Sequence, residues 1–416
     1  MEKTPAGRED SVLPGFSDNI VEKRMRFFHL SDLHIGKQLY GYSLLEDQEW
    51  ILKEIFTLAE ERKPDAILIA GDIYDKSVPS AEAVALMDRF LTSLAGIQPS
   101  IPVMIISGNH DSPERLSFAG DILENQQVYI SGLPPTTTEE YLKKVTLEDK
   151  WGKVDFWLMP FIKPGYVKNV FPGEEPETYE DAVRRLVERE TLDDSKRNVI
   201  LSHQFYTVGG EGPKQSDSET IVVGGLDQVD ISCLKEFDYG ALGHIHRPQM
   251  MGRPAMRYCG TPLKYSVSEW NQEKTLTEIE LREKGSQPVI TEIPLHPLRS
   301  VKVIRGKLED IIAEAEKVQR KEKNVCQDYV SVMLTDEQDP YQPKERLEAL
   351  FPQILEVRMD NSRTSHQEWM DEDTDTITDP REVFQRFFLQ MQGREMDEEE
   401  QQILEEVFMR VEEESR

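Results

Sequence analysis

Cysteine is scarce in this chain, with three residues among 416. Cys233, Cys259 and Cys326 lie far apart without CxxC spacing, so we expect free thiols in a reducing cytoplasm. Long hydrophobic runs are also missing: stretches such as Ala66–Ala70 have only the length of a strand, which argues against a transmembrane helix. The first 24 residues have no apolar centre of the kind that a signal peptide needs. We therefore expect a cytoplasmic protein that does not bind membranes.

Positive charge is in short supply as well. Lysine and arginine number 49 against 78 aspartates and glutamates, which gives a formal net charge of −29. An acidic surface repels nucleic acid, because phosphate binding usually requires a basic face. Bound divalent cations would supply positive charge locally, so the composition does not exclude a polyanionic substrate.

The length of the chain exceeds what a single hydrophobic core usually supports, so we expect two or three domains. From Met25 the sequence alternates strand-like and helical patterns, which predicts an α/β domain with helices outside the sheet. Later segments suggest a small α+β unit, an acidic linker and two amphipathic helices, Glu382–Met391 and Glu398–Glu413. The predicted organisation is a polar, disordered extension (1–24), an α/β domain (25–292), an α+β domain (293–360), an acidic linker (361–380) and a helical pair (381–416).

Short apolar runs mark the strands of the α/β domain. Helical periodicity covers 44–62, and Ser80 is placed to cap a second helix that continues through Leu94. The expected strands are 26–31, 66–70, 103–107, 156–159, 199–202, 239–242 and 256–258.

Five short polar stretches each follow one of these strand-like runs. In open α/β sheets, ligands bind outside the carboxyl ends of the strands, so side chains at such positions converge. The stretches are Ser31-Asp32-Leu33-His34, Gly71-Asp72-Ile73-Tyr74-Asp75, Gly108-Asn109-His110-Asp111, Ser202-His203-Gln204 and Gly243-His244-Ile245-His246.

The spacing within the stretches is informative. Asp32 and His34 are two residues apart, so on an extended segment they point to the same side, and His244 and His246 repeat the pattern. This arrangement suits one metal ion that takes both members of a pair, or two adjacent ions that take one member each. Gly71, Gly108 and Gly243 each precede a candidate ligand, where glycine permits unusual dihedral angles and close approach.

Imidazole, carboxylate and amide ligands without thiolate suit manganese, iron or zinc. The candidate ligands are Asp32, His34, Asp72, Asn109, His203, His244 and His246. Seven ligands are too many for one ion, but two ions that share a carboxylate accommodate them, and paired ions can polarise a phosphoryl group and activate water. His110 is a candidate proton donor to the leaving alkoxide, and Asp111 a candidate to orient it.

Each motif taken alone has an ordinary explanation, because Gly, Asn and Asp favour turns and a single histidine is usually structural. Together the motifs are harder to explain that way, since five of only eight histidines fall in these stretches. Of the remaining three, His29 lies within the first strand and is expected in the core, whereas His296 and His366 lack neighbouring ligand candidates.

The ordered set of motifs resembles the calcineurin-like metallophosphoesterases over roughly 25–292. Three segments are similar, more specifically, to the SbcD family of nuclease subunits, the bacterial counterparts of the Mre nucleases. They are Leu30-Ser31-Asp32-Leu33-His34-Ile35-Gly36-Lys37, Gly71-Asp72-Ile73-Tyr74-Asp75 and Tyr258-Cys259-Gly260-Thr261-Pro262-Leu263-Lys264-Tyr265-Ser266.

The resemblance implies a two-sheet α/β/β/α sandwich with a small capping domain that helps to hold DNA. One Mn²⁺ would be held by Asp32, His34, Asp72 and His246, and the second by Asp72, Asn109, His203 and His244, with His110 as proton donor. SbcD-like proteins form homodimers, and with the ATPase SbcC they form a heterotetramer. Such complexes are 3′-to-5′ double-strand exonucleases and single-strand or hairpin endonucleases used in DNA end processing, repair and recombination. The C-terminal helices would dock onto the coiled coil of the ATPase.

Two other functions are compatible with the same residues. One is a phosphoesterase that acts on small molecules or phosphoproteins, although such an enzyme would not need a capping unit and a helical pair. The other is a scaffold that only dimerises and anchors the ATPase, although a complete set of ligands together with His110 favours an active enzyme.

Overall fold

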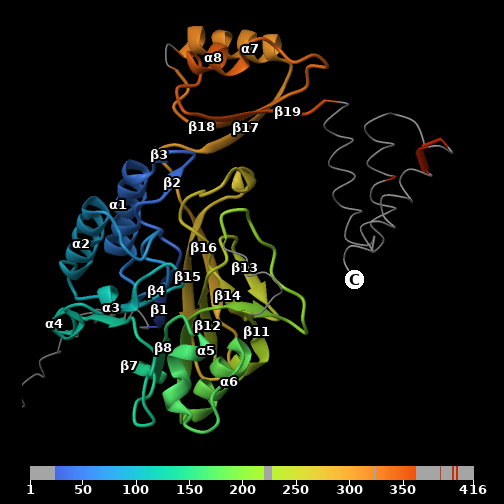
Figure 1. Ribbon diagram of the computed structural model, residues 1–416. Coiled ribbons are helices and arrows are strands. Elements are labelled where there is room, and N and C mark those ends of the chain that lie inside the picture. Colours follow the sequence, from blue (N-terminus) through green and yellow to red (C-terminus); the bar gives the residue numbers. More distant parts are fainter. Residues whose placement is uncertain are drawn as a thin grey trace, which may run out of the picture. The chain divides into compact units, whose positions relative to one another are not determined.

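The computed structural model describes residues 24–219, 227–322 and 325–361, together with five positions further along the chain. These residues form two compact units, divided between Val301 and Lys302 (Figure 1). Within these ranges no helix has the length and apolar character needed to cross a bilayer. Apart from Gln385, Glu400 and Gln401, the two helices that the sequence predicts at 382–391 and 398–413 lie outside the described residues, as does the extension before Arg24.

The first unit contains two six-stranded sheets. In the first sheet β1, β4, β5 and β6 run parallel, while β15 pairs antiparallel with β1 and β16 pairs antiparallel with β15. Its spatial order is β16 (Val289–Pro294), β15 (Thr275–Leu281), β1 (Met25–Leu30), β4 (Ala66–Ala70), β5 (Val103–Ile106) and β6 (Val128–Ser131). The parallel strands read as continuous apolar runs because both faces of the sheet are covered.

The second sheet also has six strands, but its antiparallel strands lie one at each edge. Four central strands run parallel, and β13 and β7 add antiparallel edges. Its spatial order is β13 (Gln249–Met251), β14 (Arg253–Tyr258), β12 (Tyr239–Gly243), β9 (Arg197–His203), β8 (Gly152–Met159) and β7 (Lys143–Asp149). Short two-stranded ribbons are formed by β2 (Gln38–Leu39) with β3 (Tyr42–Ser43) and by β10 (Phe205–Thr207) with β11 (Gln228–Asp230).

One apolar core joins the two sheets. Phe27, Leu68 and Met104 of the first sheet pack in a single cluster with Phe156 and Tyr239 of the second. The rings of Phe27 and Phe156 meet edge to face, with centroids 5.6 Å apart. The sheets therefore lie face to face and form the two inner layers of the predicted α/β/β/α sandwich.

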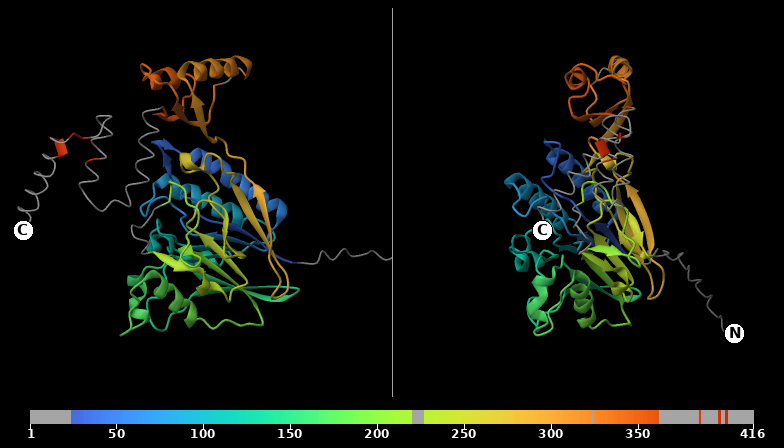
Figure 2. Two further views of the ribbon diagram at one scale, coloured as in Figure 1. Left: turned by 90° about the vertical axis from the view of Figure 1, so that its right-hand side faces the viewer. Right: turned by 45° about the vertical axis from the view of Figure 1, so that its right-hand side comes forward.

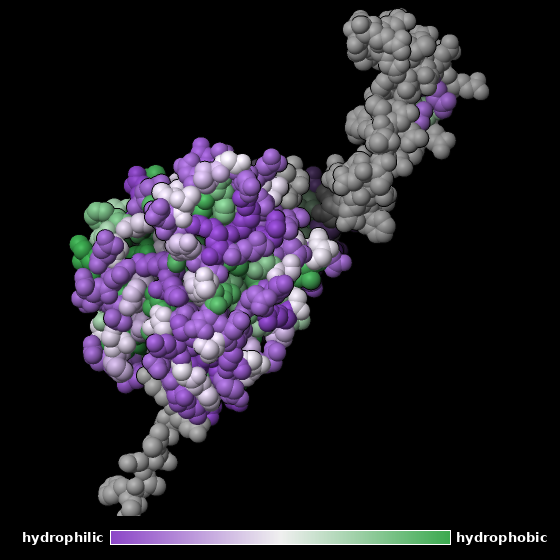
Figure 3. All heavy atoms as spheres, turned by 90° about the horizontal axis from the view of Figure 1, so that it is seen from below, coloured by the Kyte–Doolittle hydropathy of each residue, from purple (hydrophilic) through white to green (hydrophobic). Residues whose placement is uncertain are grey.

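Helices supply the outer layers. Helices α1 (Leu45–Arg62) and α2 (Ala81–Ala95) contact each other beside the first sheet (Figures 1 and 2). Ser80 caps α2 as predicted, because its side chain accepts a hydrogen bond from the Ala83 N–H. A second core cluster covers the outer face of the other sheet with α6 (Tyr179–Arg189). The short helices are α3 (Pro113–Leu116), α4 (Gly120–Glu124), α5 (Pro164–Val167), η1 (Lys168–Val170), η2 (Ile231–Leu234) and η3 (Val267–Glu269). On the face shown in Figure 3, hydrophilic residues predominate between small hydrophobic areas.

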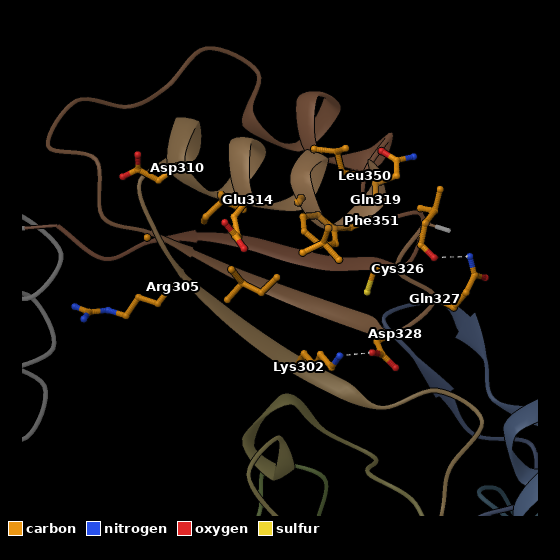
Figure 4. Close-up of a pocket in the computed structure, with 16 residues that line it drawn as sticks. Lys302, Arg305, Asp310, Glu314, Gln319, Cys326, Gln327, Asp328, Leu350 and Phe351 are labelled. Atoms are coloured by element: carbon orange, nitrogen blue, oxygen red, sulfur yellow. Dashed lines mark hydrogen bonds and ion pairs between the residues drawn. The ribbon is translucent and has the colours of Figure 1, made fainter. Parts of the chain in front are cut away.

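The second unit is a small α+β fold. Its sheet has the order β17 (Val301–Gly306), β18 (Tyr329–Leu334) and β19 (Ile354–Met359), and its helices are α7 (Leu308–Glu322) and α8 (Pro343–Glu348). Val330, Val332, Leu347 and Ile354 belong to its own apolar core. A cavity of about 630 Å³ opens between α7 and β17, lined by Ile304, Ile311, Val318, Cys326 and Phe351 among others (Figure 4).

A buried ion pair ties the second sheet together. The guanidinium of Arg197 on β9 donates two hydrogen bonds to Asp149 on β7, with Nη1 3.0 Å from Oδ2, and both side chains are almost fully buried. Removing one partner of such a pair leaves a charge without compensation in the interior.

We expect Arg197→Met to lower the free energy of unfolding by about 3–5 kcal/mol in urea titrations, because Asp149 would stay buried without its cation. A matched change at the half-exposed pair of Arg184 and Asp181, Arg184→Met, should cost less than about 1 kcal/mol. Equal effects of the two substitutions would contradict the stabilising role of the buried pair of Arg197 and Asp149.

Candidate metal centre

The five polar stretches come together across both sheets. Three follow β1, β4 and β5 of the first sheet, and the other two belong to β9 and β12 of the second. Within each sheet these strands are parallel neighbours, so their carboxyl ends share an edge. The sequence analysis expected these side chains to converge at the strand ends of an open sheet, whereas the fold places the site where the edges of two packed sheets meet.

Four of the seven candidate ligands have left-handed backbone conformations. The φ angles are 53° at Asp32, 43° at His34, 51° at Asp72 and 104° at His244. Non-glycine residues rarely adopt such values, and they concentrate at functional sites where the surrounding structure enforces them. The spacing of Asp32 and His34 suggested an extended segment, but these φ angles show that it is not extended. Its backbone N–H groups donate to Gly71 O and Asp72 O, which hold it in this conformation.

Two glycines are required by close approach. A Cβ atom on Gly108 would lie 2.1 Å from Oδ1 of Asp72, and one on Gly71, where φ is +89°, would lie 2.3 Å from Nδ1 of His203. Neither position has room for a side chain, so these glycines allow the ligand-bearing loops to pack against one another.

One group of donor atoms surrounds His34. Its Nε2 atom lies 3.2 Å from Nε2 of His246 and 3.6 Å from Oδ2 of Asp72. Asp32, His34 and His246 are all buried and offer ligand atoms within 4.8 Å of one another. Asp32 and His34 thus share one group, which is one of the two arrangements that their spacing allowed.

A second group surrounds Asn109. Its Oδ1 atom lies 3.1 Å from Nε2 of His203 and 3.0 Å from Nδ1 of His244. Oδ2 of Asp72 lies 3.4 Å from Nε2 of His203, so this carboxylate stands between the two groups. His244 and His246 are divided between the groups, which is the other arrangement that their spacing allowed.

Burial and mutual charge set the protonation of these groups. Burial lowers the pKa of His34 well below its usual value and that of His244 to about 3, which leaves both imidazoles neutral. Burial alone would lower the pKa of His203, but the carboxylates of Asp72 and Asp32 raise it to about 9. Burial raises the pKa of Asp32, whereas the pKa of Asp72 stays well below its usual value against burial, mainly through His203.

The site fits divalent cations. Neutral imidazoles present the lone pairs that metal binding needs. Ligands about 2.0–2.2 Å from a metal lie roughly 3 Å apart, close to the separations within both groups. Nε2 of His34 and Nε2 of His246 face each other directly, and Nδ1 of His34 is buried without a hydrogen-bond partner. Two buried carboxylates also require positive charge, which a proton on His203 can match only in part.

His110 and Asp111 have different surroundings. The ring of His110 is half-buried, with Nδ1 2.9 Å from the backbone oxygen of Asp75. Asp111 is buried and accepts hydrogen bonds from the N–H groups of Ile73, Tyr74 and Gly108, at 3.1, 2.9 and 2.9 Å. Burial and the charge of Asp72 raise the pKa of Asp111 to about 6. Asp111 thus joins two ligand-bearing loops, and a main-chain oxygen contacts the His110 ring.

Some residues around the site were not found from the sequence. Gln48, on the buried face of α1, donates to His34 O at 2.7 Å and accepts from Gly36 N–H at 2.9 Å, so it holds the first loop. The only sign of this role in the sequence is that Gln48, a polar residue, lies on a largely apolar face of the helix. His29 is buried beside Tyr239, as predicted for a core residue, and His296 is exposed and paired with Glu54. His366 lies outside the described residues.

Known proteins share this arrangement of motifs. The Calcineurin-like phosphoesterase family matches residues 25–248, and the Type 5 capsule protein repressor C-terminal domain matches residues 294–392. A relative from Staphylococcus epidermidis, the SbcD component of nuclease SbcCD, is 37% identical over 85% of this chain and 91% of its own length. The protein of the same name from Staphylococcus saprophyticus is 34% identical over 80% of this chain and 84% of its own length.

This chain therefore belongs to the calcineurin-like phosphoesterases, and within them to the SbcD family of nuclease subunits. Among solved structures, GAP50 of Plasmodium matches 67% of this chain and 90% of its own, with 13% identity and a TM-score of 0.40. A dimetal phosphatase from Danio rerio matches 65% of this chain and 99% of its own, with 12% identity and a TM-score of 0.36. The mixed α/β fold expected from the sequence agrees with the family.

We expect Asp111→Asn to lower the free energy of unfolding of the chelator-treated protein by about 1–3 kcal/mol, because an amide NH₂ group would face at least one backbone N–H group. Urea unfolding measures the change. The same substitution at exposed Asp88 on α2 provides the control and should have little effect. An unchanged midpoint in Asp111→Asn would contradict the role of this carboxylate in joining the loops.

Proposed function

We propose that this protein is a DNA nuclease that hydrolyses phosphodiesters at a pair of divalent metal ions. Two groups of converging ligand atoms that share Asp72, in a chain of the SbcD family, carry the proposal. The relatives are named as components of the SbcCD nuclease, which supports DNA as the substrate and an SbcC-type ATPase as the partner. The reaction classes proposed are 3′-to-5′ double-strand exonuclease and single-strand or hairpin endonuclease, in DNA end processing, repair and recombination.

The proposed ligands follow the two groups. Asp32, His34, Asp72 and His246 would hold one ion, and Asp72, Asn109, His203 and His244 the other, with Asp72 shared. Oxygen and imidazole ligands without sulfur favour Mn²⁺. When bound, such ions supply Lewis-acid polarisation of a phosphoryl oxygen and lower the pKa of water.

His110 is the proposed proton donor to the leaving alkoxide. Its Nδ1 atom contacts the backbone oxygen of Asp75, so Nε2, on the far side of the ring, is the atom that we assign to the substrate. The half-buried ring lies edge-on to His34, with centroids 4.8 Å apart. A donor at this distance from the candidate ligands can reach an oxygen that departs from phosphorus.

The acidic composition constrains how DNA is held. A net charge of −29 disfavours strong autonomous binding of a polyanion, so we assign part of the DNA-binding surface to the ATPase and part to the second unit acting as a cap. The sequence-predicted helical pair at 381–416 would dock onto that partner. Three free cysteines, Cys233, Cys259 and Cys326, are consistent with the cytoplasm as the working compartment.

Exposed apolar side chains support a homodimer. Phe118, just after α3, and Ile122 on α4 lie four positions apart in the sequence and are 81% and 70% exposed, respectively. Large apolar residues gathered at one surface mark an interaction site more often than scattered ones do. We propose that this surface pairs two copies of the chain, and that two ATPase subunits complete a heterotetramer.

We expect His110→Ala to reduce cleavage by about a hundred- to ten-thousandfold while leaving metal binding unchanged, because general acids contribute on that scale. The assays are cleavage of a labelled DNA hairpin and hydrolysis of bis(p-nitrophenyl) phosphate, both with Mn²⁺. His296→Ala, at an exposed histidine, is the matched control and should retain full activity.

The outcomes separate the candidate functions. Cleavage of both substrates by the wild type supports a complete nuclease site. If only the small diester is hydrolysed, addition of the ATPase partner and ATP distinguishes a partner-dependent nuclease from a small-molecule enzyme. Hydrolysis of neither substrate by metal-loaded protein would favour a scaffold. Loss of metal from His110→Ala would make this residue a ligand instead, since it lies near His34 and Asp72.

For the dimer, we expect Phe118→Glu combined with Ile122→Glu to convert a dimer into a monomer in sedimentation velocity at micromolar concentration. Two carboxylates in each copy would be buried against each other at the proposed surface. Val289→Glu on β16, where the side chain is 42% exposed, serves as the control and should leave the dimer intact. A wild type that sediments as a monomer would refute the proposed pairing.

A further inference from the structure

Ser218 contacts the ring of His246 on the nitrogen that faces away from His34, although the two residues are distant in sequence. The Nε2 atom of His246 faces His34 in the candidate metal centre, and its Nδ1 atom lies 2.6 Å from Oγ of Ser218. If Nε2 offers its lone pair to a cation, the ring proton must sit on Nδ1, where it is donated to Ser218. The position of the serine therefore decides which tautomer of His246 is favoured.

The hydroxyl of Ser218 also donates a hydrogen bond to a buried carboxylate. The acceptor is Oε1 of Glu269, at 2.6 Å, whereas Nδ1 of His246 lies 3.7 Å from the same oxygen. The hydroxyl thus fills a gap too long for a direct hydrogen bond. A chain of carboxylate, hydroxyl and imidazole results, directed toward the metal centre.

Lys274 fixes the charge of that carboxylate. Its Nζ atom lies 2.5 Å from Oε2 of Glu269, and Glu269 and Lys274 are 0% and 5% exposed. Although burial opposes ionisation, Lys274 and His246 hold the pKa of Glu269 well below its usual range. Lys274 also donates to the backbone oxygen of His246 at 3.1 Å, so ring and backbone of the histidine are held by one network.

Glu219, the residue that follows Ser218, forms a hydrogen bond with the backbone of the same histidine. Oε1 of Glu219 accepts a hydrogen bond from the His246 N–H at 2.8 Å. The segment that carries both residues is fastened to the loop beyond β14, because Asp217 N–H donates to Ser268 Oγ at 3.0 Å and Gln272 donates to Ser216 Oγ at 3.2 Å. Two consecutive side chains, Ser218 and Glu219, therefore converge on His246.

We propose that Ser218 is a positioning residue that sets the tautomer and orientation of His246 and thereby the metal affinity of the His34–His246 group. The inference rests on the proposed two-metal site and extends it with a hydroxyl relay from Glu269 and Lys274. Loss of a hydrogen-bond partner of a metal-binding histidine typically weakens metal binding by about 10–100-fold.

The test measures Mn²⁺ binding to metal-free protein by calorimetry, with free Mn²⁺ followed by electron paramagnetic resonance. Ser218→Ala should weaken one of two sites by about 10–100-fold and leave the other unchanged. Ser218→Thr keeps the hydroxyl and should restore wild-type binding. Ser216→Ala removes a hydroxyl that fastens the same segment to Gln272 without contacting His246, and should weaken binding less than Ser218→Ala does.

The outcomes distinguish this inference from the proposed function beneath it. Two wild-type affinities in Ser218→Ala would overturn the inference and leave the two-metal site standing. Equal weakening in Ser216→Ala, or no rescue in Ser218→Thr, would show a general disturbance of the segment and also overturn it. Failure of the wild type to bind two ions would overturn the proposed function together with the inference. Thermal unfolding in the presence of chelator checks that every variant is folded.

Discussion

The burial of carboxylates and imidazoles at the junction of the two sheets is the constraint on which the rest of this structure depends. Asp32 and Asp72 are nearly inaccessible to solvent, and their charges cannot remain in a low-dielectric interior without compensation. Four histidines surround them, yet His34 and His244 are kept neutral by burial. Bound cations would therefore compensate the charge of the carboxylates, and the fold provides ligands for them by bringing five strand ends together.

The supporting contacts follow from the same constraint. A ligand is useful only when its geometry is fixed, and here polar groups behind the loops support four of the five ligand-bearing stretches. Gln48 holds the loop after β1, Asp111 joins the loops after β4 and β5, and Ser218 with Glu219 holds His246. Left-handed backbone at four candidate ligands is sustained by this network, because isolated loops would relax to commoner conformations.

Most of the candidate site was accessible from the sequence because its residues occur in short local motifs. Asp-x-His, Gly-Asp-x-x-Asp, Gly-Asn-His-Asp and Gly-His-x-His each place several ligands within a few residues, directly after an apolar run. The strands themselves were predictable for the same reason: buried parallel strands such as β4 and β5 are continuous apolar stretches. The cap of α2 at Ser80 is also a local feature, since it depends on a hydroxyl three residues from its partner.

The residues that the sequence did not reveal act over long separations. Ser218, Glu269 and Lys274 carry no local pattern, and they meet His246 only after β12, β14 and the loops beyond them have packed. The spacing of His244 and His246 left open whether they serve one group or two, and packing of the two sheets divided them between His203 and His34. By itself, then, the sequence determined the family, seven of the eight parallel strands in the two six-stranded sheets and the types of candidate ligand, because these depend on neighbours along the chain. Which side chains share a group, and what orients them, was decided by tertiary structure, because those contacts join residues far apart in the sequence, such as His34 and His246, which are 212 positions apart.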